Sequence, residues 1–186
     1  MRRFSSPISI PNILTLVRIL LTPVFVILLL RGLYAYALAV FVFAGVSDGL
    51  DGFIARYFNQ RTALGAYLDP TADKLLLVSS FVTLAALQVI PAWVAVVVIT
   101  RDVLIVVGIA IFTLFEKAYD VHPSIWSKLT TASQLLLVAA TLFDPTRARL
   151  PDLHAPLIWV TAGVTILSGL HYIYIGMSIL QETGES

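Results

Sequence analysis

Residues 48–73 read DGLDGFIARYFNQRTALGAYLDPTAD and place four carboxylates among apolar residues. Asp48 and Asp51 lie three residues apart, and Asp69 and Asp73 lie four apart. In helices each pair projects from one face, so two helices can direct all these acids towards one point. The pattern indicates a built site, because small residues beside the acids let a second backbone or a ligand approach closely. These small residues are Gly49, Gly52, Ala55, Gly65 and Ala66.

The composition predicts an integral membrane protein. Of the 186 residues, 59% are hydrophobic and 12% are charged, and the mean hydropathy is +0.92. An ordinary soluble domain is far less apolar, and about 20 apolar residues suffice for a helix to cross a bilayer. Six such segments lie at about 11–30, 33–56, 69–90, 92–115, 124–143 and 155–180. We therefore expect an all-α, polytopic membrane protein with six transmembrane helices in one bundle. Residues 1–186 would form a single domain, with a short interfacial segment at 1–10.

The third segment is predicted to begin near Asp69. The Asp-Pro pair at 69–70 fits an N-cap residue followed by a proline at the first helical position. The polar stretch at 57–66 would then form a short loop between the second and third segments.

Charge and cysteine content exclude several classes of protein. The net charge is +1 and no dense cluster of Lys and Arg occurs, which argues against a nucleic acid as partner. The chain contains no cysteine, so it has no disulfides, no thiolate metal sites and no cysteine nucleophile.

The distribution of basic residues predicts the orientation of the chain in the membrane. One side of the membrane receives Arg2, Arg3, Arg56, Arg61, Lys117 and Lys128. The other side receives Arg31, Arg147 and Arg149. We therefore expect a multi-pass protein of the inner or cytoplasmic membrane, with both termini and the mouth of the acidic site in the cytoplasm.

Several charged residues lie within the predicted spans and need partners. Arg18 lies in the first span, and Arg101 and Asp102 are neighbours in the fourth. Adjacent helical residues do not face each other, so we expect Arg101 and Asp102 to find different partners. Lys74 points about 100° away from Asp73 on a helix, and we expect it to meet phosphate or another acid. Pairing that only satisfies the helix bundle is the alternative to substrate contact for these charges.

The four clustered acids require compensation. A charged side chain at mid-helix costs about 2.5 to 3.5 kcal/mol on insertion scales, and neighbouring carboxylates repel each other. Either some acids are protonated or a cation lies between them. The available ligands are oxygens, which favour Mg²⁺ first and Mn²⁺ or Ca²⁺ after it, and four carboxylates could hold two ions. Because paired divalent ions stabilise phosphoryl displacement, the residues predict a phosphate ester or anhydride as substrate at the membrane surface.

The spacing in this stretch also resembles a family signature. It fits D-x2-D-G-x2-A-R-x8-G-x3-D-x3-D at Asp48, Asp51, Gly52, Ala55, Arg56, Gly65, Asp69 and Asp73. This pattern resembles that of the CDP-alcohol phosphotransferase (CDP-alcohol phosphatidyltransferase) family at all eight positions, and six spans agree with that family's six-helix core. The resemblance implies a single catalytic domain in which an alcohol attacks the β-phosphate of a CDP-linked lipid, here CDP-diacylglycerol, and CMP is released.

The resemblance also implies roles for the residues of the signature. The metal ligands would be Asp48, Asp51, Asp69 and Asp73, holding Mg²⁺ or Mn²⁺ as two ions. Asp73 would also be the catalytic general base. Nucleotide and substrate would be bound at Gly52, Ala55, Arg56 and Gly65. The family further suggests a homodimer among membrane lipids.

Two acceptor alcohols stay open. IPNILTLVRILLTPVFV at 10–26 and GAYLDPTADKLLL at 65–77 look most like the branch that makes phosphatidylglycerol phosphate from glycerol 3-phosphate. RDVLIVVG at 101–108 and PSIWSKLTTASQ at 123–134 look at least as much like cardiolipin synthases, whose acceptor is phosphatidylglycerol. A dianionic glycerol 3-phosphate needs cations. The candidates are Arg61, Arg101, Lys117 and Lys128.

Two further classes are alternatives to an enzyme. Acids within a membrane span can line an ion path, so a cation channel or carrier could use them as ligands. Such a protein would not need the Gly, Ala and Arg positions of the signature. A non-catalytic lipid-binding scaffold would gain nothing from four intact acids, which are costly to keep within a membrane.

Overall fold

All regular secondary structure in the described part of the chain is helical, as predicted. The computed structural model describes residues 10–57, 63–114, 125–146, 148 and 151–182, and it describes side chains within 13–48, 71–108, 125–146, 148 and 152–178. These residues form six helices and no strand. The helices are α1 (Ile10–Leu30), α2 (Tyr34–Tyr57), α3 (Ala63–Ala86), α4 (Ala92–Leu114), α5 (Ile125–Phe143) and α6 (Pro151–Glu182).

The third helix begins earlier than the sequence pattern predicts. Helix α3 starts at Ala63, so Asp69 and Pro70 lie within the helix and not at its N-terminus. The prediction of an N-cap at Asp69 is therefore wrong. The preceding residues 63–68 include good helix formers, and a proline removes one backbone hydrogen bond without having to end the helix.

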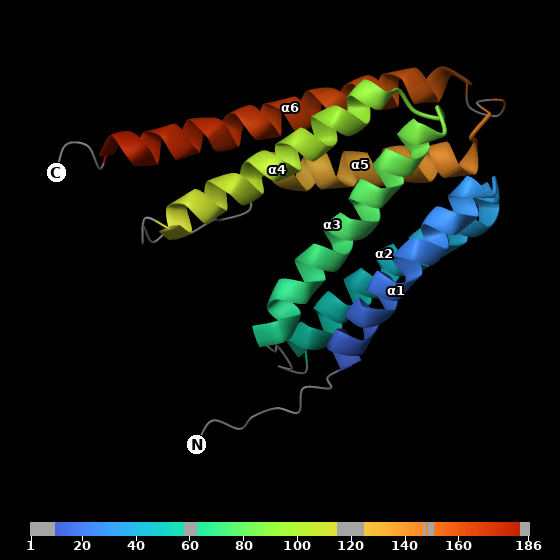
Figure 1. Cartoon of the computed structure of the whole chain (residues 1–186), viewed down its shortest axis with the longest axis horizontal. Helices are drawn as coiled ribbons and strands as arrows, with labels where there is room; N and C mark the ends of the chain where they lie inside the picture. The colour runs from blue at the N-terminus through green and yellow to red at the C-terminus, as the bar shows by residue number, and fades with distance from the viewer. Residues whose placement is uncertain (1–9, 58–62, 115–124, 147, 149–150, 183–186) are drawn as a thin grey trace.

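The helices pack as two connected groups (Figure 1). In the first group α1 packs against both α2 and α3, and in the second α6 packs against both α4 and α5. Contacts of α3 with α4 and of α2 with α5 join the two groups. Helix α3 thus has one neighbour, α1, in the first group and another, α4, in the second. Both halves of the site described below depend on this position of α3.

Two short turns fix the antiparallel packing at one end of the molecule. Helix α1 is followed by Gly32 at a φ of 71°, and the Leu33 N–H donates to the carbonyl oxygen of Leu28 at 2.9 Å. Helix α3 is followed in the same way by Gln88, whose φ is 59°. This hydrogen bond and the left-handed residue define a Schellman cap, in which glycine avoids the strain that glutamine must accept.

The interior is apolar, and a polar seam lies between α5 and α6. The core includes Phe25, Phe41 and Phe81. Along the seam, the Thr130 hydroxyl donates to the Val164 carbonyl oxygen at 3.2 Å. Further bonds from Thr161 to the Ser133 carbonyl oxygen and from Gln134 to Thr165 continue it. In an apolar environment such hydrogen bonds between helices hold a bundle together.

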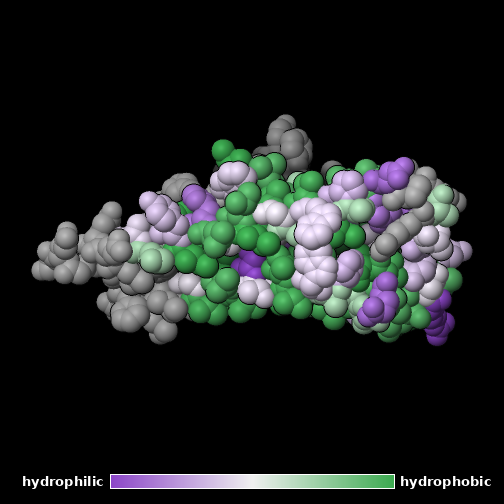
Figure 2. Space-filling model, turned by 90° about the horizontal axis from the view of Figure 1, so that it is seen from above, coloured by the Kyte–Doolittle hydropathy of each residue, from purple (hydrophilic) through white to green (hydrophobic). Residues whose placement is uncertain are grey.

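The outer surface is suited to lipid. Hydrophobic side chains cover most of the middle of the face seen in Figure 2. Among the described residues, two helices are long and apolar enough to cross a membrane by length and composition, over Ile13–Leu30 and Asp152–Ser178. These two helices support association with a membrane.

Candidate functional site

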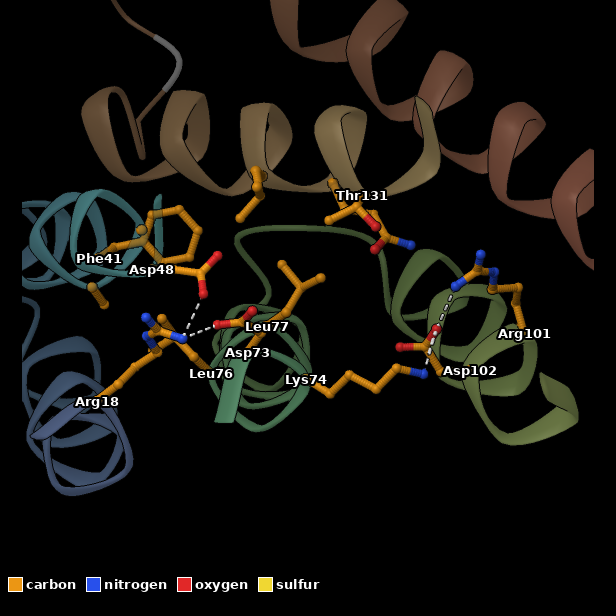
Figure 3. Close-up of a pocket in the computed structure, with 14 residues that line it drawn as sticks. Arg18, Phe41, Asp48, Asp73, Lys74, Leu76, Leu77, Arg101, Asp102 and Thr131 are labelled. Carbon is orange, nitrogen blue, oxygen red and sulfur yellow. Dashed lines mark hydrogen bonds and ion pairs between the residues drawn. The ribbon is translucent and has the colours of Figure 1, made fainter. Parts of the chain in front are cut away.

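Helices α1, α2 and α3 bring Arg18, Asp48 and Asp73 together (Figure 3). One nitrogen of Arg18, Nη1, donates to Oδ1 of Asp48 at 3.0 Å and also to Oδ1 of Asp73. The Arg18 side chain is 2% exposed, whereas those of Asp48 and Asp73 are 44% and 45% exposed. The arrangement therefore places a buried cation behind two carboxylates that remain open on their other side.

The local sequence explains how these side chains reach one another. Thr15, Arg18 and Thr22 lie on one buried face of α1, spaced by three and four residues. The Thr22 hydroxyl donates to the Arg18 carbonyl oxygen at 3.1 Å, which satisfies this polar side chain within the helix. Opposite them, Gly45 lies one turn before Asp48, and a Cβ added there would meet no atom within 4 Å. The space beside Asp48 is therefore open.

A second charged cluster lies on an adjacent side of α3, facing α4. Lys74 Nζ lies 3.4 Å from Oδ1 of Asp102 on α4, and Nη1 of Arg101 donates to the same oxygen at 2.8 Å. The expectation that Lys74 meets another acid is confirmed. The expectation that Arg101 and Asp102 do not pair with each other is wrong, because the long arginine side chain folds back to its neighbour despite their divergent directions along the helix.

Both clusters open into one cavity of about 290 Å³. Because Asp73 and Lys74 are consecutive in α3, the two clusters lie on adjacent sides of the same helix turn (Figure 3). Apolar side chains form much of the wall between them. The lining residues with polar side chains are Arg18, Asp48, Asp73, Lys74, Arg101, Asp102, Thr131 and Gln134.

The remaining residues of the predicted site have different positions. Asp51, Gly52, Ala55 and Arg56 follow Asp48 in α2, and Gly65 and Asp69 precede Asp73 in α3, but their side chains lie outside the described ones. Arg61 and Lys117 lie outside the described residues. Lys128 is exposed on α5 and does not line the cavity, whereas Arg101 does.

Several cavity residues were missing from the predicted site. The sequence predicts that Arg18, a cation within the first span, needs a partner, but its partners lie 30 and 55 residues away along the chain. Thr131 and Gln134 gave no charge signal in the sequence. The periodic polar face of α1, with Arg18 at its centre, was the available signal for a contact with the acids.

The described acids have the donor chemistry of a divalent cation site. Oδ1 of Asp48 and Oδ1 of Asp73 already converge on one cationic nitrogen, and carboxylate oxygens are the ligands that Mg²⁺ and Mn²⁺ prefer. The side chains present therefore fit such an ion. Among the side chains that the structure describes, no group of three or more acids or histidines could hold a metal. The four-carboxylate site remains a prediction, since Asp51 and Asp69 would supply the other ligands.

The fold and the site define a helical protein with paired carboxylates between three helices. The model of the CDP-alcohol phosphatidyltransferase family matches residues 8–167, and the chain belongs to this family. The matched residues include the whole of α1 to α5 and the first half of α6.

The relatives include proteins named cardiolipin synthase and proteins named phosphatidylglycerophosphate synthase. The human protein named cardiolipin synthase (CMP-forming) is 35% identical over 195 residues, covering 96% of this chain and 65% of that protein. The probable phosphatidylglycerophosphate synthase of Mycobacterium tuberculosis is 31% identical, covering 89% of this chain and 80% of that protein. The CDP-diacylglycerol–glycerol-3-phosphate 3-phosphatidyltransferase of Bacillus subtilis is 30% identical, covering 88% and 93%. The chain thus spans about two thirds of the human relative's length.

Proposed function

We propose that this chain is a membrane enzyme that transfers the phosphatidyl group of CDP-diacylglycerol to a hydroxyl of glycerol 3-phosphate. The products are CMP and phosphatidylglycerol phosphate. One observation carries the proposal: two half-exposed carboxylates, Asp48 and Asp73, converge beside a cavity in a chain of the CDP-alcohol phosphatidyltransferase family. The names of the mycobacterial and Bacillus relatives support this acceptor.

In the proposed reaction the acceptor oxygen forms a bond to the β-phosphorus as the bond from that phosphorus to the CMP oxygen breaks. The acceptor proton passes to a carboxylate oxygen of Asp73, and CMP leaves as the anion. An alcohol is a poor nucleophile at neutral pH unless its proton is removed during attack. Asp73 is suited to accept it because its side chain is open to the cavity on the side away from Arg18.

A divalent cation would be held by Asp48, Asp51, Asp69 and Asp73, of which the first and last converge in the structure. Such an ion supplies stabilisation of the negative charge on the phosphate oxygens. The residues of the chain would position the substrates around it. Gly52, Ala55, Arg56 and Gly65 would bind the nucleotide, and Arg18 would hold the orientation of Asp48 and Asp73 from behind.

The membrane arrangement is part of the same proposal. All six helices would cross the inner or cytoplasmic membrane as one catalytic domain, with both termini and the site on the cytoplasmic side. The exposed apolar surface and the apolar α1 and α6 support this arrangement. The enzyme would work as a homodimer in contact with membrane lipids.

Phosphatidylglycerol is the second candidate acceptor and would give cardiolipin. The name of the human relative and the apolar wall of the cavity favour it. That wall includes Phe41, Leu76, Leu77 and Leu135, which suit the glycerol and acyl parts of a lipid better than a small dianion.

The test is to incubate the purified protein with CDP-diacylglycerol, Mg²⁺ and one acceptor at a time. CMP release and the lipid product are both measured. Formation of phosphatidylglycerol phosphate supports the proposal, whereas formation of cardiolipin alone selects the second candidate. Absence of CMP release with every acceptor would contradict both, and ion flux into liposomes would then test the channel or carrier.

Metal removal is the control for the site in the same assay. We expect chelation to stop turnover and added Mg²⁺ or Mn²⁺ to restore it, with Asp48→Asn raising the metal concentration required. Asp152→Asn is the matched control, because Asp152 is an exposed acid in the first turn of α6. Full activity in chelator would contradict the metal site.

A further inference from the structure

Arg101 has almost no hydrogen-bonding capacity left for a ligand. Its Nε donates to Ser168 Oγ at 3.3 Å, and its Nη2 donates to Ser168 Oγ at 3.0 Å and to Ser127 Oγ at 2.9 Å. Its Nη1 donates to Asp102 Oδ1 at 2.8 Å. A guanidinium has five N–H groups, and these contacts use the one on Nε, both on Nη2 and one on Nη1. Arginine binds phosphate best through two parallel N–H groups, which Arg101 cannot offer without breaking bonds.

Packing also fixes Arg101 in place. The residue is 6% exposed, and its guanidinium carbon lies 5.7 Å from the centre of the Tyr172 ring, within the range of a cation–π contact. Gly169 of α6 lies beside the arginine stem, where a Cβ would make an ordinary van der Waals contact with Arg101 Cγ at 3.7 Å. Arg101 is therefore held by α5 and α6 and directed at Asp102.

Lys74 has the capacity that Arg101 lacks. Its side chain is 41% exposed and lines the cavity, and among the described residues it pairs with Asp102 at 3.4 Å. An ammonium group has three N–H groups on a flexible stem, so most of its capacity stays open to a ligand. Lys74 also follows Asp73 directly, which places it beside the carboxylates of the proposed transfer.

Asp102 allows Lys74 to change partner at little cost. If Lys74 turns from Asp102 to a phosphate group, Asp102 keeps its bond to Arg101, so no buried carboxylate is left unpaired. Leaving a buried charge without a partner is the main cost of breaking an ion pair. Lys74, Arg101 and Asp102 together carry a net positive charge, which favours an anion beside this cluster.

We infer that Lys74 contacts the phosphate group of the acceptor, and that Arg101 is a positioning residue that acts through Asp102. This inference rests on the proposed phosphatidyl transfer. The phosphate is the monoester of glycerol 3-phosphate or the diester of phosphatidylglycerol. What the two acceptors share is an anionic phosphate on the same glycerol as the attacking hydroxyl.

The experiment is a double-variant cycle in the CMP-release assay with each acceptor in turn. We expect Lys74→Gln to raise the KM of the acceptor about ten- to a hundredfold, as for loss of a charge-assisted contact, with the KM of CDP-diacylglycerol within a few-fold. Arg101→Gln should raise the acceptor KM by a smaller factor. When Arg101→Gln is made in the Lys74→Gln background, it should raise the acceptor KM by less than about a further twofold, because the effect of Arg101 passes through Lys74. The acceptor with the larger response identifies the source of the phosphate.

Two further variants complete the cycle. Ser168→Ala removes the oxygen that accepts two N–H groups of Arg101 and replaces Arg101→Gln if that variant does not fold. It should raise the acceptor KM about two- to threefold alone and not at all with Lys74→Gln. Arg31→Gln removes an exposed cation in the turn after α1 and should leave the acceptor KM unchanged.

Three outcomes overturn the inference, and they are distinguishable. If wild-type protein releases CMP but Lys74→Gln leaves the acceptor KM unchanged, this inference fails and the proposed function stands. The same holds if Arg101→Gln or Ser168→Ala multiplies the effect of Lys74→Gln, since Arg101 would then contact the acceptor itself. If wild-type protein releases no CMP with either acceptor, the proposed function fails and this inference fails with it.

Discussion

Two buried arginines face the same cavity and have opposite kinds of partners. Arg18 contacts two carboxylates, which arrive from α2 and α3 and stay nearly half exposed. Arg101 contacts two serine hydroxyls, one carboxylate and an aromatic ring, and its partners are contributed mainly by α5 and α6. The first arginine balances charges that remain available to a ligand, whereas the second is enclosed by the helices around it.

Burial alone does not identify a residue that binds substrate. Both arginines have less than a tenth of their surface exposed, and both line the cavity. What separates them is the chemistry of the partners. Neutral hydroxyls satisfy a guanidinium without needing a ligand, but two carboxylates on a single Nη1 atom still have unused lone pairs. The exposed carboxylates therefore lie in the half of the cavity where the proposed transfer would occur.

The largest effect is expected for a substitution of Asp73, which changes only the region around Arg18. Asp73→Asn keeps the size of the side chain and one oxygen ligand but removes the proposed base. We expect kcat to fall by about 10² to 10⁴, with the affinities for CDP-diacylglycerol and Mg²⁺ within a few-fold. Steady-state CMP release and separate binding measurements check this. Joint loss of metal affinity, nucleotide affinity and rate would instead make Asp73 only a metal ligand.

A smaller effect is expected on stability when each of the two arginines is replaced. Arg18→Gln leaves two carboxylates without their cation and should cost about 3 kcal/mol, the low end for a buried pair because both acids are half exposed. For a chain of this size that corresponds to a fall in Tm of roughly 6 to 12 °C. Arg101→Gln should cost less, because Asp102 keeps Lys74.

Thermal unfolding in detergent and chelator measures both variants. Added Mg²⁺ should recover more of the loss in Arg18→Gln than in Arg101→Gln, since a divalent cation can replace the missing charge only beside Asp48 and Asp73. Equal losses with equal recovery would show that the two regions do not differ in this way.

The smallest effect tests the redundancy around Arg101. Ser127→Ala removes one of two hydroxyls that accept from Nη2 and leaves the other in place. We expect a loss of about 1 kcal/mol in the free energy of unfolding and an acceptor KM within about threefold of wild type. If the free energy of unfolding falls as much as in Arg18→Gln, the serine hydroxyls around Arg101 contribute as much to stability as the ion pairs of Arg18. Denaturation in detergent with and without Mg²⁺ gives the measurement.

The sequence predicted much of the fold and the approach of Asp48 to Asp73. Helical spacing of Asp48 and Asp51, and of Asp69 and Asp73, correctly indicated two helices, and hydropathy correctly indicated the helical fold of the described residues. The predicted start of α3 at Asp69 was wrong because good helix formers precede the Asp-Pro pair and extend the helix to Ala63. Spacing along a helix describes directions from the axis, whereas contact depends on the reach of each side chain.

Long side chains account for most of what the sequence could not predict. Arg101 folds back to Asp102 although their directions on α4 diverge, and its guanidinium there also contacts Ser127 of α5 and Ser168 of α6. Arg18 reaches two helices, and which acids it meets depends on the positions of α2 and α3 in the bundle. A sequence shows that a buried cation needs a partner, but the tertiary packing selects the partner.

The contact of Arg18 with α2 and α3 also has a consequence for assembly. Helix α1 is apolar enough by length and composition to enter a membrane, although it carries this cation. The helices that follow it along the chain bring acids that each cost about 2.5 to 3.5 kcal/mol at mid-membrane. Because α1 precedes α2 and α3 along the chain and packs against both, Arg18 would already be in position to neutralise Asp48 and then Asp73 as each arrives in the proposed six-span arrangement. In that arrangement the residue that holds the acids in the folded protein would also lower the cost of bringing them into the membrane.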